Sequence, residues 1–254
     1  MTQGRLAFTE RDAGREAFGK PRAGACGRVA FALLAFSQVS LIAAVSLVAV
    51  ALPAVQEDLG LNELQITLVT AGYGAAFSGL LILGGRLGDL LGSRAVFVAG
   101  MALFGLASAA GASATGFGPL VAARFGQGAG AALAAPAALA LAGALFADPD
   151  RRARVLAVWG GLSATGAVLG MLLSGVITAW LGWRWVFAPP ALGAVLALTA
   201  GPALLPRAVP RPRVRLDVLG GVIATAGLSA LMYGLLTLTG DAARGAWAIA
   251  TLGG

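Results

Sequence analysis

The stretch GRLGDLLGSR, residues 85–94, carries three charged side chains between two long apolar segments. The flanking segments, residues 66–84 and 95–114, contain no charged residue. About 20 apolar residues, at a helical rise of about 1.5 Å per residue, cross a hydrocarbon layer about 30 Å thick. Each flanking segment is therefore predicted to be a membrane-spanning helix. The charged decapeptide is predicted to be a hairpin that lies in water at one face of the membrane.

The overall composition agrees with a membrane protein. Hydrophobic residues make up 58% of the chain, charged residues only 11%, and there are 38 glycines. Soluble domains are about 45–50% apolar and about 25% charged. Glycine is common in transmembrane helices, where small residues let backbones approach each other. A soluble domain is therefore excluded.

Apolar stretches recur along the chain and predict an all-α, polytopic membrane protein. Seven are long enough to span a bilayer: residues 29–55, 65–84, 95–114, 119–146, 155–179, 186–205 and 218–240. An eighth begins at Trp247 and stops at Gly254, which leaves only about 12 Å of helix. We therefore expect a six-helix bundle followed by one complete and one truncated helix, with the chain ending inside the membrane.

Basic residues are concentrated on one side of this topology. The N-terminal arm, residues 1–28, and the alternate loops hold 15 of the 18 lysines and arginines, whereas the opposite side holds only Arg184 and Arg244. Because cytoplasmic loops are enriched in basic residues, we expect a cytoplasmic N terminus in the plasma (inner) membrane. The first span is expected to act as a signal anchor. This distribution also accounts for the net charge of +7 without nucleic-acid binding.

Missing residue types exclude several kinds of function. The chain has no histidine and one cysteine, Cys26, which argues against haem, most zinc sites, iron–sulfur clusters and internal disulfides. The only lysine, Lys20, lies in the arm, so no span offers an amine for a Schiff base. Residues 14–21 have the spacing of a phosphate loop, but Pro21 replaces its Ser or Thr. We expect no cofactor, no metal and no enzymatic activity.

The decapeptide resembles the loop between the second and third helices of the major facilitator superfamily. The family pattern is Gly, any residue, Leu, a small residue, Asp, a basic residue, any residue, Gly and two basic residues. This chain departs from it at Leu90 and Ser93. The resemblance implies a cytoplasmic latch that holds two halves of a transporter together in the outward-facing state, whereas an ordinary polar turn is the alternative. Asp89 would make the contact, Arg94 would support it ionically, and Gly85, Gly88 and Gly92 would shape the turn.

The fourth span resembles the family's second motif, Leu-x3-Arg-x2-Gln-Gly-x-Gly-Ala-Ala, at Leu120, Arg124, Gln127, Gly128, Gly130, Ala131 and Ala132. Arg124 lies about 9 Å inside the outer end of its span. An arginine at that depth needs a wet cavity or a partner, unless it snorkels to the outer surface. Gln127 lies on nearly the same helix face. We therefore expect a substrate or coupling cavity with the candidate lining residues Arg124, Gln127, Gln38, Tyr73 and Trp159.

Two further motifs of the family are altered in this chain. The fifth span aligns with the antiporter motif, which ends Gly-Pro-x-x-Gly-Gly, but Met171 replaces the proline and Ser174 one glycine. The remaining small residues predict a helix-packing face made of Gly166, Gly170, Ser174 and Gly175. The first span resembles Asp-x-Thr-Ile-Val-Asn-Val-Ala-Leu-Pro, with Ala44 and Ala49 in place of the acid and the amide. If protons are coupled, the titrating acid is expected elsewhere.

The end of the bundle is similar to the fourteen-helix drug:proton antiporters of this family. Residues 183–187, WRWVF, resemble that branch's Trp-Arg-Trp-x-Phe, and residues 216–220, LDVLG, resemble the start of its seventh helix. The resemblance implies an N-terminal bundle over residues 29–205, a basic cytoplasmic linker over 206–217 and linking helices over 218–254. It implies export of small organic or drug-like molecules by alternating access, coupled to protons in a complete protein.

An alternative of another class is a truncated, transport-inactive fragment or a membrane-embedded partner module. The expected partners are the lipid bilayer, a small-molecule substrate and protons. A C-terminal bundle or another subunit would be needed for transport.

Overall fold

The computed structural model describes residues 25–146, 149–206, 220, 223 and 227. Every described element is helical: α2 Ala25–Leu59, α3 Glu63–Leu91, α4 Ser93–Ala112, α5 Phe117–Ala144, α6 Pro149–Trp180, the short 3-10 helix η1 Trp183–Phe187, and α7 Ala188–Leu204. The predictions for most of the N-terminal arm, for nearly all of the 206–217 linker and for nearly all of the 218–254 segment after it lie outside the described residues.

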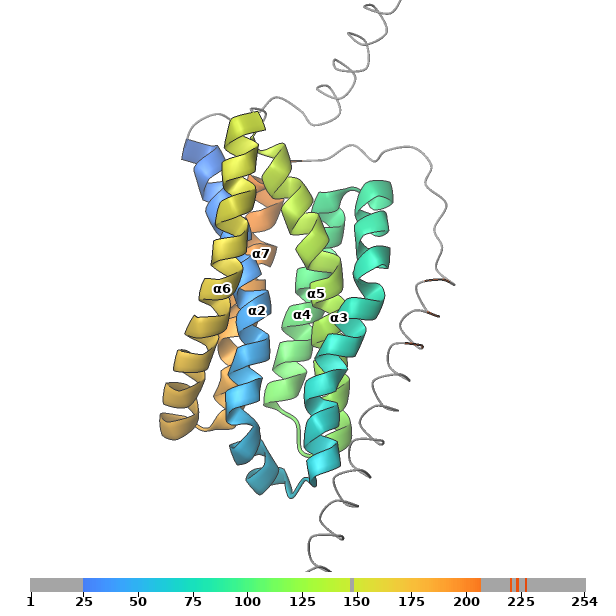
Figure 1. The fold of residues 1–254 in the computed structure, drawn as a ribbon, viewed down its shortest axis with the longest axis vertical. Coiled ribbons are helices and arrows are strands. Elements are labelled where there is room, and N and C mark those ends of the chain that lie inside the picture. Colours follow the sequence, from blue (N-terminus) through green and yellow to red (C-terminus); the bar gives the residue numbers. More distant parts are fainter. Residues whose placement is uncertain (1–24, 147–148, 207–219, 221–222, 224–226, 228–254) are drawn as a thin grey trace, which may run out of the picture.

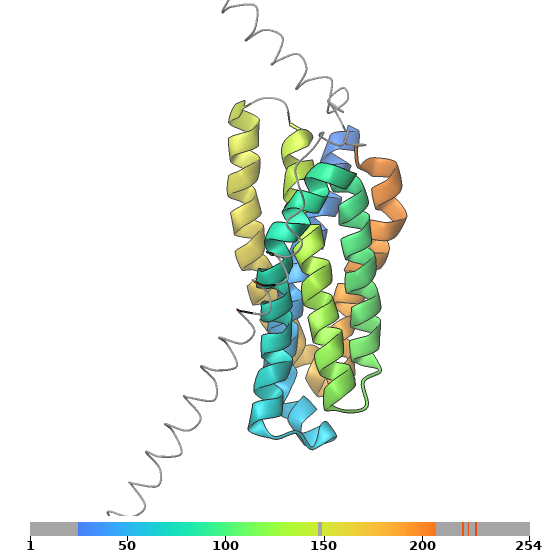
Figure 2. The same ribbon diagram turned by 90° about the vertical axis from the view of Figure 1, so that its right-hand side faces the viewer.

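Successive helices run in opposite directions, so their connections alternate between the two ends of the bundle (Figure 1). The helices α6 and α7 lie on opposite sides, with α2 between them (Figure 2). Within the described part of the chain, six helices are long and apolar enough to cross a membrane. The prediction of an all-α, multi-pass membrane protein is confirmed. In lipid, such helices satisfy their own backbone hydrogen bonds, which an isolated strand or loop cannot do.

The charged decapeptide is not the hairpin predicted from its charges. The helix α3 continues through Leu91, and only Gly92 interrupts it before α4 begins at Ser93. Gly92 has φ +89°, a conformation that glycine adopts without steric cost. Hydropathy indicates where lipid ends, but a helix can extend into water. At 29 residues, α3 is about 44 Å long and exceeds the hydrocarbon thickness.

Local sequence also explains two connections at the opposite end. Asn62 caps α3, because its Oδ1 accepts from the Gln65 backbone N–H and the Gln65 side chain accepts from the Asn62 N–H. The predicted span over residues 186–205 begins instead with η1, and α7 follows with proline in its first turn. Proline is favoured there because the first N–H groups of a helix have no intrahelical acceptor.

The helix α5 packs closely against both α3 and α4 through the glycines of its motif. A Cβ placed on Gly128 would lie 2.3 Å from the Tyr73 carbonyl oxygen of α3, and one on Gly130 would lie 2.6 Å from the Phe104 backbone nitrogen of α4. Only residues without a side chain permit these approaches. The glycines of the second motif therefore bring three helices together next to Arg124.

We predict that Gly128→Ala destabilises the bundle, because its methyl group would collide with the backbone of α3. Overpacking of this kind typically costs about 1–3 kcal/mol. Gly118→Ala in the same helix is the matched control, since a Cβ there meets no heavy atom within 4 Å. Thermal melting of the purified protein in detergent should show a lower midpoint for Gly128→Ala alone. Equal midpoints for the two variants would contradict the packing described here.

Candidate functional site

A cavity of about 490 Å³ opens mainly between α2 and α3. Its wall is largely apolar, with a few neutral polar side chains and no charged one. The lining residues are Gln38, Leu41, Ile42, Val45 and Ser46 of α2, Thr70, Tyr73, Gly74 and Phe77 of α3, Ala135 of α5 and Ala167 of α6.

Arg124 lies next to this cavity but is enclosed in the bundle, with 1% of its surface exposed. One terminal nitrogen, Nη1, donates to Gln127 Oε1 at 2.8 Å and to the Ala44 carbonyl at 3.3 Å. The guanidinium carbon lies 4.8 Å from the centroid of the Tyr73 ring. The near-complete burial excludes snorkelling to the surface.

The hydrogen bonds of Arg124 continue into α4 through Gln127, which is fully buried. Gln127 Nε2 donates to Ser108 Oγ at 2.9 Å, and Ser108 Oγ donates to the Phe104 carbonyl at 2.7 Å. Ser108 was not predicted to belong to this site. In the sequence it is only a neutral polar residue inside a charge-free span, and many such serines bond only to the backbone of their own helix.

The partners of Arg124 are neutral groups. Among the described side chains, no carboxylate lies within ion-pair distance of its guanidinium, and its Nε has no hydrogen-bond partner. Removing an arginine from water without an opposite charge is costly, and oriented carbonyl, amide and aromatic groups offset part of that cost. The site therefore holds a buried positive charge that no described acid neutralises.

Tyr73 connects this network with the cavity. Its hydroxyl donates to the Leu41 carbonyl at 3.0 Å, and its ring stacks on Phe77 with centroids 6.1 Å apart. One side chain thus contacts Arg124, ties α3 to α2 and forms part of the cavity wall.

The structure divides the five predicted cavity residues into two groups. Gln38 and Tyr73 line the cavity. The other three do not line it. The side chains of Arg124 and Gln127 are buried in the interior of the bundle, and Trp159 is buried among apolar core residues. Arg124 and Gln127 do lie side by side, as predicted, and they are hydrogen-bonded to each other. Neither of them lines the cavity.

The predicted latch residues lie at one end of the bundle. Asp89 is exposed near the end of α3, and no described residue forms an ion pair with it. Arg94 instead donates to the Pro202 carbonyl of α7. The ionic support of Asp89 by Arg94 is therefore absent from this structure, because Arg94 reaches across to the end of another helix.

The predicted small-residue face of α6 packs against α2 at three of its four positions. A Cβ on Gly166 would lie 3.0 Å from the Val39 carbonyl oxygen, and one on Gly170 would lie 2.9 Å from that of Ala43. Ser174 Oγ donates to the Leu47 carbonyl at 2.5 Å. The inclusion of Gly175 is wrong, since a Cβ there meets nothing within 4 Å. One residue beyond Ser174 is a rotation of about 100° around the helix, away from α2.

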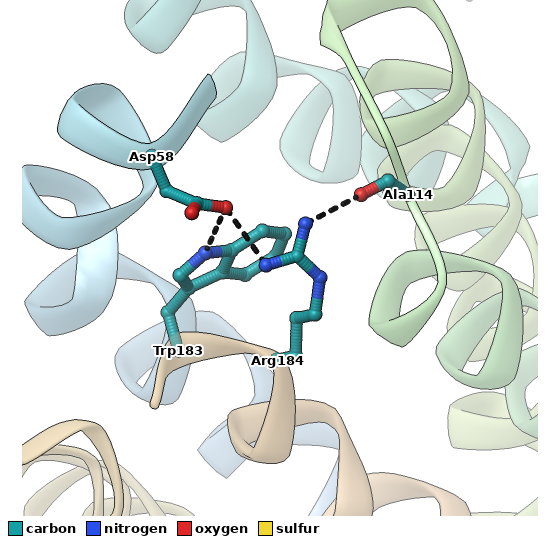
Figure 3. A network of polar contacts seen from close by, with 4 residues as sticks. All are labelled: Asp58, Ala114, Trp183 and Arg184. Atoms are coloured by element: carbon teal, nitrogen blue, oxygen red, sulfur yellow. Dashed lines mark hydrogen bonds and ion pairs between the residues drawn. The ribbon is translucent and has the colours of Figure 1, made fainter. Parts of the chain in front are cut away.

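A second polar cluster, also missed, joins three segments at the opposite end of the bundle (Figure 3). Asp58 Oδ2 accepts from Trp183 Nε1 at 3.0 Å and from Arg184 Nη1 at 2.7 Å. Arg184 Nη2 donates to the Ala114 carbonyl at 3.3 Å, and its guanidinium lies over the Trp183 ring at 4.4 Å. The cluster ties the end of α2 to η1 and to the connection between α4 and α5. Among the described residues no three His, Cys, Asp or Glu side chains come together as metal ligands.

The fold and the site define a membrane-embedded helical bundle of the transporter type, and comparison with known proteins identifies its family. The model of the Major Facilitator Superfamily matches residues 34–252. The chain belongs to this superfamily.

Several curated relatives carry names that refer to antibiotics. The puromycin resistance protein pur8 of Streptomyces alboniger is 44% identical over 189 residues, which cover 74% of this chain and 37% of the relative. The cephamycin export protein CmcT of Amycolatopsis lactamdurans is 45% identical over 192 residues, covering 75% of this chain and 40% of the relative. The lincomycin resistance protein of Streptomyces lincolnensis is 37% identical over 229 residues, which cover 88% of this chain and 46% of the relative. The chain therefore spans less than half the length of these relatives.

A solved structure also shares the fold. The peptide transporter POT in complex with alafosfalin superposes with a TM-score of 0.66 at 22% identity, covering 85% of this chain and 48% of that one. At this identity the likeness shows the fold alone.

We predict that the Asp58 cluster depends on Trp183 more than on its ion pair. Trp183 is 4% exposed and packs edge-on against Phe187, so Trp183→Ala should cost about 3–5 kcal/mol, as for other buried aromatic residues. Asp58 and Arg184 are 47% and 42% exposed, and water screens their attraction. Asp58→Asn should therefore shift the melting midpoint far less than Trp183→Ala. Equal shifts, or a larger one for Asp58→Asn, would contradict this prediction.

Proposed function

We propose that this chain forms one bundle of a secondary transporter that exports small drug-like molecules by alternating access. The observation that supports it best is the cavity between α2 and α3, in a chain whose relatives are named for antibiotic export or resistance. Binding sites for drug-sized molecules usually measure about 300–1,000 Å³ and are mostly apolar. The cavity is of this size and character.

Alternating access requires a second bundle against which the first can rock. We propose that a C-terminal bundle or another subunit supplies it. Asp89 is exposed at the end of α3 and forms no ion pair with a described residue, and in this proposal its carboxylate binds such a partner in the outward-facing state. In this proposal Gly85, Gly88, Gly92 and Arg94 hold the end of α3 and the start of α4 in position for that contact.

The proposed location is the inner membrane, with the N terminus in the cytoplasm. The start of α2 and the connection between α3 and α4 lie at the same end of the bundle (Figure 1). That end carries Arg28, Arg86 and Arg94, whereas Arg184 is on the opposite side. An excess of basic residues is typical of the cytoplasmic side.

We further propose that protons drive export and that the titrating acid lies outside the described bundle. The described carboxylate side chains are all exposed near helix ends: Glu57, Asp58, Glu63 and Asp89. Ala44, where related antiporters carry an acid, is fully buried and offers Arg124 only its carbonyl. A group that carries protons across a membrane must be able to titrate within the transport path.

We predict that cells expressing the protein from its own gene accumulate less of at least one antibiotic among puromycin, cephamycin and lincomycin. A protonophore should abolish the difference from cells with an empty vector, because export is proposed to use the proton gradient. Accumulation of labelled antibiotic is the measurement. Equal accumulation of all three compounds in both strains would contradict the proposed function.

In the same assay, Arg124→Ala should lower the export rate about tenfold while the protein still inserts into the membrane. The reason is the loss of buried, charge-assisted hydrogen bonds, worth about 1.5–3 kcal/mol each, where 1.4 kcal/mol corresponds to tenfold. Insertion depends on the apolar spans and should persist. Export at the wild-type rate would show that Arg124 has no part in transport.

A further inference from the structure

A buried glutamine belongs to the wall of the cavity between α2 and α3. Gln38 of α2 is 8% exposed and is one of the lining residues. Its Nε2 donates to Ser163 Oγ of α6 at 3.4 Å. Its Oε1 is buried and has no hydrogen-bond partner among the residues that the structure describes. A buried acceptor without a donor is unfavourable, so this oxygen would gain from a donor that enters the cavity.

Ser163 determines which end of the Gln38 amide is left for a ligand. A serine hydroxyl has one proton and two lone pairs, and Ser163 donates its proton to the Trp159 carbonyl of its own helix at 3.1 Å. Toward Gln38, the Ser163 oxygen can therefore only accept. It requires the amide nitrogen as its donor, and this network assigns the orientation of the amide. The carbonyl oxygen of Gln38 is consequently the end that a ligand can use.

A small side-chain movement brings Gln38 Oε1 to a molecule in the cavity. The last torsion of a glutamine side chain has a broad energy well. The bond from Nε2 to Ser163 Oγ is long at 3.4 Å. The amide can therefore turn toward a donor in the cavity while its nitrogen stays within reach of Ser163, without any change in the backbone of α2.

The other polar side chains of the wall add acceptors more than donors. Thr70 donates its hydroxyl proton to a carbonyl of its own helix at 3.2 Å, and Tyr73 donates its own to a carbonyl of α2 at 3.0 Å. Both oxygens keep lone pairs, but their protons are already used. The Ser46 hydroxyl, also in the wall, can donate or accept, and Gln38 keeps a second amide proton. Acceptors therefore outnumber donors around the cavity.

We propose that Gln38 determines specificity in this cavity by accepting a hydrogen bond from an N–H or O–H group of the substrate, and that Ser163 orients its amide for this bond. The inference rests on the proposed transport function, because it names the chemical class of molecule that the transporter binds. Molecules of the same shape without a donor bind more weakly, since they leave Gln38 Oε1 unpaired.

Carbazole and dibenzofuran test this preference. They are uncharged and share one planar shape, but carbazole has an N–H where dibenzofuran has an oxygen atom. Binding of each compound is measured by equilibrium dialysis against the protein, expressed from its own gene and reconstituted in lipid nanodiscs, with empty nanodiscs as the correction for uptake into lipid. The wild-type protein should bind carbazole about tenfold more tightly than dibenzofuran, as expected when a buried acceptor gains a donor.

Substitutions of Gln38 and Ser163 should reduce this ratio of affinities. Gln38→Met keeps the size of the side chain but removes the acceptor, so the ratio should fall about tenfold. Ser163→Ala frees the amide to present either end, so the ratio should fall at least about twofold. Ser78→Ala is the matched control, because Ser78 also donates to a carbonyl of its own helix but does not line the cavity. Its ratio should equal that of the wild type.

The outcomes separate this inference from the function on which it rests. Equal wild-type affinities, binding of neither compound, or a ratio that stays unchanged in Gln38→Met would overturn the inference. If Gln38→Met does not fold, an unchanged ratio in Ser163→Ala would overturn it. The antibiotic accumulation assay tests transport independently of these results. A donor preference that depends on Gln38, in a protein that exports no antibiotic, would leave the binding site standing and overturn the transport function.

Discussion

The buried guanidinium of Arg124 is the constraint on which the arrangement of the site depends. A charge at that depth is tolerated only when polar groups surround it. Two neighbouring helices supply such groups, the Ala44 carbonyl from α2 and the Tyr73 ring from α3. Gln127 of α5 itself supplies a third, and it is in turn hydrogen-bonded to Ser108 of α4. Through Tyr73, the network also determines part of the cavity wall. A residue that lies outside the cavity thus contacts one of the residues that line it.

Close helix packing makes this network possible. Gly128 and Gly130 let α5 approach α3 and α4 to distances at which a Cβ would overlap backbone atoms. On the other side of the bundle, Gly166 and Gly170 do the same for α6 against α2. Between lipid-exposed helices there is no hydrophobic driving force, so such small-residue contacts contribute much of the packing energy. The polar network and the glycine contacts stabilise the same group of helices.

The sequence was sufficient to predict the six helices, because a charge-free stretch of about 20 residues has few alternatives to a membrane span. It did not predict that α3 extends to Leu91, since hydropathy records the edge of the lipid and not the end of a helix. The motif around Arg124 indicated a buried cation, but the Ser108 and Asp58 contacts depend on how helices distant in sequence are rotated against each other. For the same reason, the sequence predicted Gln38, Tyr73 and Trp159 alike as lining residues, although only Gln38 and Tyr73 line the cavity.

The central claim is that the space between α2 and α3 is a water-accessible substrate site, whereas other apolar surface faces lipid. The single cysteine of the chain, Cys26, can be replaced by serine so that one new cysteine at a time reports on its surroundings. In native membranes, a water-soluble maleimide should label Thr70→Cys and Val45→Cys in the cavity, and an exported antibiotic should slow that labelling. Leu106→Cys, on α4 and 72% exposed in the isolated bundle, should remain unlabelled. Labelling of Leu106→Cys, with Thr70→Cys and Val45→Cys left unlabelled, would contradict the account.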